Sequence, residues 1–409
     1  MATTDAMATT DLENGRDEAT PPRQVPFARA EICEEARAAS ARVLESGWLT
    51  TGPEVVAFER ELAEWVHADH GVAVASCTAA IELALRALRL PPGAKVLTST
   101  MTFCGAVHAI VHAGLVPVLA DVDPLTLCSD APACAAAARR AGGVDAMVVV
   151  HYAGFPAPVH ELAEAAGLPL GRVVEDAAHA LGTWVGSRPV GSLSAATCFS
   201  FYATKNLPVG EGGMLTTADQ EVADYARRAR LHGMSRDAWK RYLPGSAWRY
   251  SVDIAGLKAN MTDVQAAIGR AQLRHFAGWQ DRRALLARRY DEALAGIPGL
   301  RPPARPGQGR HAWHLYVVQV EPEFGLGRDD LVAELGGQGV SCSVHFIPVH
   351  HFPYFQQLLG ADLAGRHPGA DAAFERVVSL PLYPGLALAD VDYVCERIAS
   401  LCRARAVLR

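Results

Sequence analysis

The chain alternates short apolar runs with longer segments in which apolar residues recur every three or four positions. Short, mostly apolar runs are typical of strands buried on both faces of a sheet, and they lie at 72–75, 95–98, 116–121, 146–151, 173–176 and 197–201. The helical spacing predicts helices over 31–46, 53–68, 78–90, 105–113, 131–141 and 158–166. This alternation predicts an α/β fold with a mostly parallel sheet that helices cover on both faces.

The pattern changes after residue 201. A further strand at 214–217 follows too closely for a crossover helix, so we expect it to run antiparallel to its predecessor. Helical spacing continues over 219–232, 260–278 and 279–295, and a proline-rich stretch follows at 298–306. The remaining elements indicate an α+β unit, with segments at 313–320, 328–337, 341–346, 371–377 and 390–404. We therefore predict a disordered head (1–25), a large domain (26–278) and a smaller C-terminal α+β domain (279–409).

Composition narrows the class of protein. Half of the 409 residues are hydrophobic and 20% are charged, which is ordinary for a globular chain of two domains. The net charge of -6 disfavours a general nucleic-acid binder but leaves room for a local phosphate site. GxGxxG and GxxxxGK[ST] are both absent, which disfavours a dinucleotide-binding Rossmann enzyme and a P-loop nucleotide hydrolase.

Cysteine usage and hydropathy predict a cellular location. The nine cysteines are scattered without a CxxC pair, which fits a reducing compartment better than a disulfide scaffold. No apolar run reaches the length of a membrane span, and residues 1–25 lack the apolar core of a signal peptide. We expect a cytoplasmic protein with no membrane partner.

One lysine stands in a setting that suits a covalent cofactor. Lys205 follows the apolar run 198–202, and burial there lowers the pKa of an ammonium and frees a neutral amine. Such an amine forms a Schiff base with an aldehyde. Asp176 ends a predicted strand, where a carboxylate can pair with a protonated pyridine nitrogen. With Ser200 between them, these residues predict pyridoxal phosphate (PLP).

Three motifs around these residues carry a resemblance. They are Glu-Asp-Ala-Ala-His-Ala-Leu-Gly at 175–182, Phe-Ser-Phe-Tyr-Ala-Thr-Lys-Asn at 199–206 and Gly-Glu-Gly-Gly-Met at 210–214. They resemble the signatures of the DegT/DnrJ/EryC1/StrS family, the PLP-dependent, fold-type I aminotransferases of nucleotide sugars. The resemblance extends from about residue 26 to about residue 399. It implies that Lys205 carries the cofactor, whereas the sugar dehydratases of the family have histidine at this position.

The resemblance also implies a phosphate site. Ser-Cys-Thr-Ala at 76–79 joins a predicted strand to a helix, and a helix N-terminus offers free amides to a phosphate. It is similar to the family's Ser-Gly-Thr-Ala, with Thr78 and the Ala79 amide as donors. Cys77 replaces the family's glycine, which raises the question of how closely the backbone can approach. Ser200 adds a hydroxyl donor.

Three further residues are implied by matched motifs. His179 stands where the family has Gln or His against the phenolic oxygen of the cofactor, and Phe103 matches the aromatic that stacks on the ring. Asn260 lies in 255–267, which resembles a family segment that reaches the phosphate of a neighbouring subunit. A homodimer with shared sites is therefore implied, although the residue alone is equally compatible with a simple helix cap.

The substrate is implied less directly. Ser-Val-His-Phe-Ile-Pro at 343–348 resembles a family segment, and we place His345 in the sugar site. This segment and 99–103 look most like members that aminate C4 of a 4-keto sugar on dTDP or UDP. L-glutamate would be the amino donor and 2-oxoglutarate its product, in amino-sugar or antibiotic biosynthesis. A 3-keto aminotransferase and a PLP-fold regulator without turnover stay open as alternatives.

Metal chemistry has one weak indication. His108 and His112 are four residues apart on a predicted helix, a spacing that can bind a metal. No third ligand is evident in the sequence, so we interpret both as helix-face residues and predict no metal.

Overall fold

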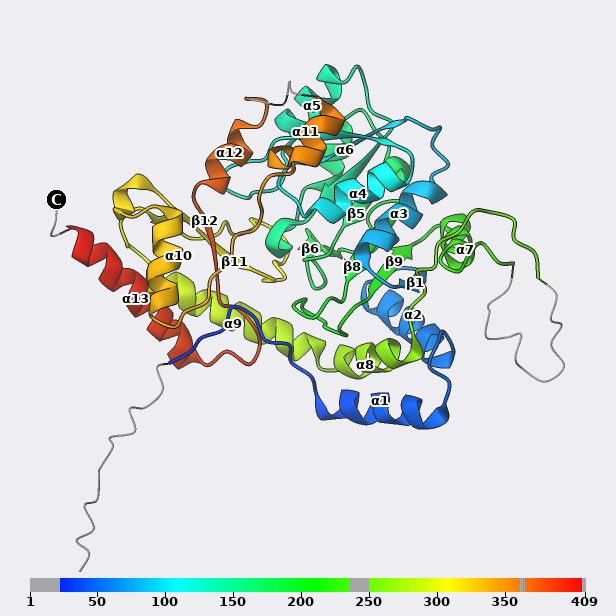
Figure 1. Ribbon diagram of the computed structural model, residues 1–409, viewed down its shortest axis with the longest axis horizontal. Helices are drawn as coiled ribbons and strands as arrows, with labels where there is room; N and C mark the ends of the chain where they lie inside the picture. The colour runs from blue at the N-terminus through cyan, green and yellow to red at the C-terminus, as the bar shows by residue number, and fades with distance from the viewer. Residues whose placement is uncertain (1–22, 236–249, 361–362, 364, 407–409) are drawn as a thin grey trace, which may run out of the picture.

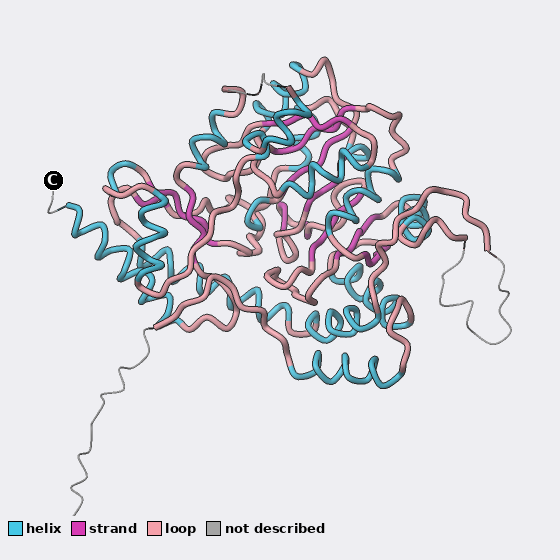
Figure 2. Tube along the Cα trace, in the orientation of Figure 1, coloured by secondary structure: helices cyan, strands magenta, loops and turns pink. Residues whose placement is uncertain are grey.

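The computed structural model describes residues 23–235, 250–360, 363 and 365–406. Within this part of the chain a seven-stranded sheet has the order β1-β9-β8-β5-β4-β2-β3. Its strands are β1 (His70–Val74), β2 (Lys95–Ser99), β3 (Val116–Ala120), β4 (Ala146–Val150), β5 (Val173–Asp176), β8 (Ala196–Ser200) and β9 (Gly213–Thr217). Figure 2 shows them as one array of strands with helices around it.

The strand directions agree with the sequence pattern. The pairs β2–β3, β2–β4, β4–β5 and β5–β8 are parallel. β9 runs antiparallel to β8, as its short connection requires, and also antiparallel to the edge strand β1. The carboxyl ends of the parallel strands therefore meet along one edge, where α/β proteins place their ligand sites.

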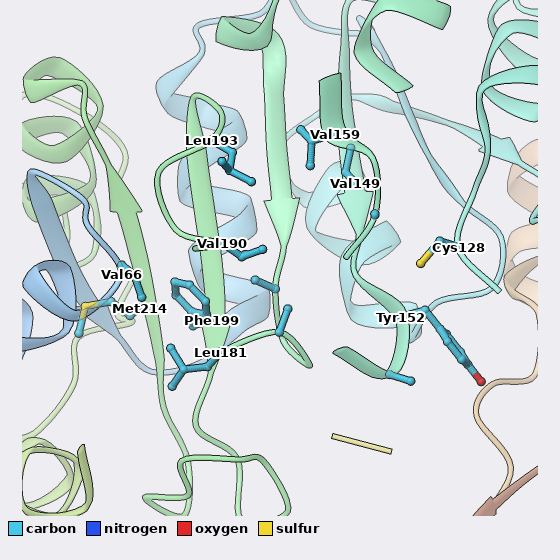
Figure 3. Close-up of a cluster of buried hydrophobic side chains, with 14 of the residues drawn as sticks. Val66, Cys128, Val149, Tyr152, Val159, Leu181, Val190, Leu193, Phe199 and Met214 are labelled. Carbon is cyan, nitrogen blue, oxygen red and sulfur yellow. The ribbon is translucent and has the colours of Figure 1, made fainter. Parts of the chain in front are cut away.

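Helices cover both faces of this sheet. One face carries α2 (Pro53–Trp65), α5 (Ala131–Arg140), α6 (Val159–Ala165) and α8 (Asp263–Leu273), and the other carries α3 (Cys77–Ala87), α4 (Cys104–His112) and α7 (Gln220–Ala229). β4 shows the alternation, since Met147 and Val149 pack in the first cluster whereas Ala146 and Val148 pack in the second. Figure 3 shows Val149 of the first cluster with Phe199 of β8 and Met214 of β9, which lie further along the same sheet.

A second core lies under the C-terminal part of the chain. An antiparallel sheet joins β10 (Leu300–Arg301), β11 (Tyr316–Val320) and β12 (Val377–Leu380). Three helices pack on the residues of this core, and they are α9 (Phe276–Leu294), α10 (Arg328–Gly337) and α13 (Leu388–Ala406). These elements gather on the left of Figure 1, away from the large sheet.

The remaining elements are short or peripheral. α1 (Glu34–Ser46) packs lengthwise on α8 through small side chains, as Figure 1 shows below the sheet. A two-stranded hairpin joins β6 (Trp184–Val185) to β7 (Arg188–Pro189). The chain between β11 and α13 holds the 3₁₀ helix η5 (Val349–His351), α11 (Pro353–Leu359) and α12 (Pro368–Phe374).

The structure corrects some sequence boundaries. The predicted helices 260–278 and 279–295 break at Arg274 and His275 instead, so α9 runs across the predicted domain boundary at 278. Residues 341–346, which the sequence analysis assigned to the α+β unit without an element type, contain one isolated bridge, Ser343 to Ser379. The predicted head lies outside the described residues up to 22. Val25, the last residue of the predicted head, is described and is held in place, because it is 1% exposed and bridges Val340.

A buried carboxylate joins the starts of two helices. Asp263, 2% exposed, begins α8, and its Oδ1 accepts from the amides of Gly52 at 2.8 Å and Val55 at 3.0 Å. Its Oδ2 accepts from the Glu54 amide at 3.3 Å. These amides belong to the first turn of α2 and have no acceptor within that helix. Asp263 thus fixes α2 against the segment that carries Asn260.

Asp263→Ala should lower the free energy of unfolding by about 2 kcal/mol, because buried first-turn amides lose a charged acceptor. Chemical denaturation at one fixed protein concentration measures the change. The matched control is Asp69→Ala, whose side chain is exposed. Equal stability of the two variants would contradict the capping role.

Candidate active site

A cavity of about 530 Å³ opens at the carboxyl ends of the parallel strands. The residues that line it come from widely separated segments, beginning at Phe27 and ending at Leu382. Eight of the nine residues predicted for the site lie in this cavity or in the helix turn beside it, and they are Thr78, Ala79, Phe103, Asp176, His179, Ser200, Lys205 and His345. Asn260 is the one that the structure places elsewhere.

Asp176 ends β5 with its side chain in the cavity. It is 8% exposed, and its Oδ1 accepts from the Ala178 amide at 3.1 Å. Burial raises the pKa of this carboxyl, while the Ala178 amide and Lys205 oppose the rise. Glu175 points to the opposite face, as the strand geometry predicts. There it accepts from Ser194 at 2.7 Å and pairs with His151 at 2.9 Å.

Lys205 lies in the turn that follows β8. The turn is closed by the Lys205 amide, which donates to the Tyr202 carbonyl at 2.8 Å. The partly buried ammonium loses hydration, which lowers its pKa from 10.5 to about 8, although Asp176 acts in the other direction. A lysine with such a pKa supplies a neutral amine near neutral pH.

The first turn of α3 forms one wall of the cavity. Its N-cap is Ser76, whose Oγ accepts from the Ala79 amide at 3.1 Å. The first intrahelical hydrogen bond of α3 runs from the Ala80 amide to the Ser76 carbonyl, so the amides of Cys77 and Thr78 have no acceptor within the helix. These two amides and the Thr78 hydroxyl are the helix donors nearest the cavity.

The cysteine that replaces the family glycine does not obstruct this turn. Cys77 is buried, and its thiol turns inward to the Cys198 carbonyl at 3.2 Å and toward Asp176 Oδ1 at 3.7 Å. The tight approach lies instead at Gly213 of β9. A Cβ there would lie 2.6 Å from the Cys77 amide nitrogen, so a larger residue would displace the turn.

His179 is held in one tautomer. Its Nδ1 accepts from the Ala153 amide at 3.2 Å, which leaves the proton on Nε2 as a donor. Burial, with a further contribution from Lys205, holds the pKa of His179 well below its usual value. The ring stacks on Phe346 with centroids 5.6 Å apart. His179 is therefore a neutral hydrogen-bond donor facing the cavity.

His314 and Asn206 were not placed in the site by the sequence analysis. His314 lines the cavity and packs on His179 with ring centroids 4.3 Å apart. Its Nδ1 lies 3.0 Å from Oδ1 of Asn206, and Asn206 also donates to the Ala312 carbonyl at 2.9 Å. Since Asn206 follows Lys205, this link fixes the lysine turn to residues 312–314. Only the adjacency of Asn206 to the lysine could have indicated it.

The predicted ring and sugar residues lie at the mouth of the cavity. Phe103 is 62% exposed, and its ring centroid is 6.2 Å from that of Phe346. His345 stacks on Phe27 at 5.5 Å, and its Nδ1 lies 2.9 Å from Ser379 Oγ. Burial lowers the pKa of His345 to about 4, with Lys205 contributing. His345 therefore faces a ligand as a neutral imidazole.

Asn260 lies outside the cavity of its own chain. Its Nδ2 donates to Thr51 Oγ1 at 2.8 Å, and its Oδ1 accepts from Lys258. It does not cap the next helix, because Thr262 is the N-cap of α8.

His108 and His112, the pair with a metal-binding spacing, both lie on α4. The rings of His108 and His112 stack 6.0 Å apart on α4. Among the described residues, neither belongs to a group of three converging metal ligands.

Comparisons with known proteins agree with the geometry. The model of the DegT/DnrJ/EryC1/StrS aminotransferase family matches residues 30–399. This chain belongs to that family. The aminotransferase is 44% identical over 381 residues to the spore coat polysaccharide biosynthesis protein SpsC of Bacillus subtilis (strain 168), covering 93% of this chain and 97% of SpsC.

Solved structures give the same result. The PMP form of the putative sugar aminotransferase Spr1654 from Streptococcus pneumoniae superposes with a TM-score of 0.84 at 30% identity, covering 93% of this chain and 100% of that one. DesV from S. venezuelae, solved in complex with a ketimine intermediate, has a TM-score of 0.79 at 33% identity, covering 90% and 94%. The chain is therefore a PLP-dependent sugar aminotransferase of fold type I.

The residues of the cavity fit PLP. Gly213 lets β9 pack directly against the α3 turn, whose free amides suit a phosphate. The donor Nε2 of His179 suits a phenolic oxygen, and Asp176 suits a pyridine nitrogen.

The rate at which Lys205 of the cofactor-free enzyme captures PLP should rise with pH around a midpoint of about 8, because only the neutral amine reacts. Asp176→Asn should move this midpoint to lower pH, since the carboxylate raises the pKa of Lys205. Borohydride trapping and mass analysis measure the capture. Lys205→Ala is the control and should retain no label. A midpoint near the ordinary 10.5 would contradict the burial of the amine.

Proposed function

We propose that this aminotransferase converts a 4-keto sugar carried on a nucleotide, dTDP or UDP, into the 4-amino sugar with L-glutamate as amino donor. The observation that supports this most is the single cavity in which Lys205, Asp176 and the donor face of His179 meet. SpsC, named for spore coat polysaccharide biosynthesis, supports a role in the synthesis of an amino sugar.

PLP, when bound, supplies an electron sink for a carbanion next to the reacting nitrogen. Thr78, the Ala79 amide and Ser200 would hold its phosphate. Ala79 would exchange its hydrogen bond to Ser76 for one to the ligand. Asp176 would keep the proton on the ring nitrogen, and Phe103 would cover one face of the ring.

Lys205 would move the proton during turnover. Its neutral amine would take a proton from the amino-bearing carbon and return it to the carbon on the other side of the reacting nitrogen, so one group would act as base and then as acid. The link from Asn206 to His314 holds the turn that carries this amine. A lysine of ordinary pKa would stay protonated at neutral pH and could not start the cycle.

The other wall of the cavity would receive the sugar. His345, His314 and Phe346 face it from the C-terminal half of the chain. The two imidazoles have lowered pKa values, because both are buried, and they can therefore donate to or accept from hydroxyl groups as neutral partners.

The proposed active unit is a homodimer. Asn260 lies outside the cavity of its own chain, on a segment fixed by Thr51 and Asp263. Phe103 is 62% exposed at the cavity mouth, where a second chain would cover it. We infer that Asn260 completes the phosphate site of the partner. The free thiols of all nine cysteines support a cytoplasmic enzyme.

The first alternative, a 3-keto aminotransferase, differs from the proposal in the position of the keto group. The second, a PLP-fold regulator, differs in having no turnover. A 3-keto sugar would enter the same cavity with a rotated ring. A regulator without turnover would not need a Lys205 amine of lowered pKa or the Asp176 carboxylate beside it. The presence of both favours an active enzyme.

The substrate can be tested with the PLP-loaded enzyme, L-glutamate and four sugars: dTDP- and UDP-linked, each with a keto group at C4 or C3. Release of 2-oxoglutarate should be fastest with a 4-keto sugar, and the product should carry nitrogen at C4 by NMR. Faster turnover of the 3-keto sugars would replace the proposal with its alternative. No turnover of any sugar would favour the regulator.

Mixing inactive Lys205→Ala with Asn260→Ala should restore activity. In a mixed dimer one site receives both lesions and the other neither, so random exchange leaves about a quarter of all sites intact. Turnover is measured before and after exchange, and native mass analysis confirms mixed dimers. Mixing Lys205→Ala with Asp176→Ala is the matched control and should restore nothing. No recovery despite exchange would mean that Asn260 acts within its own chain.

A further inference from the structure

A second cluster of ligating side chains lies outside the cofactor cavity. It comprises the Nε2 or Nδ1 atoms of His350 and His351 on η5 and a carboxylate oxygen of Asp371 on α12, all within 4.8 Å of one another. About twenty residues separate the two elements, so the fold brings the ligands together. A search for histidines at helical spacing, which finds His108 and His112, does not find this cluster, because its two histidines are adjacent and its carboxylate lies on another element.

The two imidazoles converge on one atom. Nε2 of His350 and Nε2 of His351 each lie 2.8 Å from Asp371 Oδ1. The other nitrogen of His350, Nδ1, lies 2.7 Å from the Thr100 hydroxyl, which is fully buried. A hydroxyl can accept or donate. Thr100 can therefore hold the same ring whether Nε2 carries a proton or binds a metal, as outer partners of metal ligands do.

We propose that His350, His351 and Asp371 bind one zinc ion, with a water molecule as the fourth ligand. Two imidazoles and one carboxylate are ligands that zinc accepts in tetrahedral sites. Magnesium and calcium prefer sets made of oxygen alone. His350 is 5% exposed and holds the inner side, whereas His351 and Asp371 are partly exposed and leave a path for the ion.

The position of the cluster gives the ion a structural role at the cofactor cavity. The Val349 amide, beside the ligands, donates to the Thr100 carbonyl at 2.8 Å. Thr100 begins the loop that ends at Phe103, and His345 with Phe346 precedes η5 in the same segment. A zinc ion would therefore fix two walls of the cavity to α12.

The test uses the PLP-loaded enzyme without an affinity tag, dialysed against a chelator. Zinc binding is measured by competition with a chromophoric chelator, and the thermal midpoint is followed with and without zinc. We expect one zinc per chain and a higher thermal midpoint with zinc. His351→Gln and Asp371→Asn should each weaken binding more than about 100-fold, and Thr100→Val about 10-fold, since outer partners contribute less than ligands.

Two controls separate this site from others. His112→Gln removes an exposed histidine of α4, and Cys33→Ser removes a residue of the other converging group, Cys33, Glu35 and His275. Both should bind zinc as the unaltered enzyme does. The proposal is overturned if the enzyme binds no zinc at one per chain, or if His351→Gln and Asp371→Asn leave the affinity unchanged. Loss of binding in Cys33→Ser alone would assign the ion to that other group.

Discussion

Lys205 and Asp176 are groups of opposite charge in one cavity, and burial disfavours the charged form of each. Burial lowers the pKa of the amine and raises that of the carboxyl, while each group partly restores the charge of the other. The Ala178 amide adds a hydrogen bond to the carboxylate. As a result of these opposing shifts, Lys205 can lose its proton near neutral pH. The Asp176 carboxylate beside it can pair with a protonated pyridine ring. The surrounding imidazoles stay neutral in this setting because burial also disfavours their charged forms.

The parallel sheet and the two charged residues could be predicted from the sequence because their signals are local. Apolar runs fix strands, and a lysine or aspartate that directly follows such a run lies at a strand end. The predicted phosphate turn is also local, since a strand that ends in Ser-Cys-Thr-Ala must present amides at the start of α3. Cys77, which stands where the family has glycine, directs its thiol to the Cys198 carbonyl.

The parts that escaped prediction depend on contacts across long stretches of chain. His314 contacts Asn206, which is 108 residues away in the sequence, and no short sequence motif indicates that pair. Val25 pairs with Val340 although its sequence surroundings are those of a polar head. The helix break before α9 falls at Arg274 and His275, where neither proline nor glycine marks it. In each case tertiary packing, rather than local propensity, decides the outcome.

The hydrogen bonds from Asn206 to His314 and Ala312 also set an order of events during synthesis. The lysine turn emerges from the ribosome long before residues 312–314, and the wall formed by residues 345–382 follows later still. Domains generally fold as units as the chain is made, so the sheet can form while the lysine still lacks its final partners. We therefore expect cofactor capture to follow the folding of these later segments. A truncated chain could keep the sheet and still be unable to hold PLP.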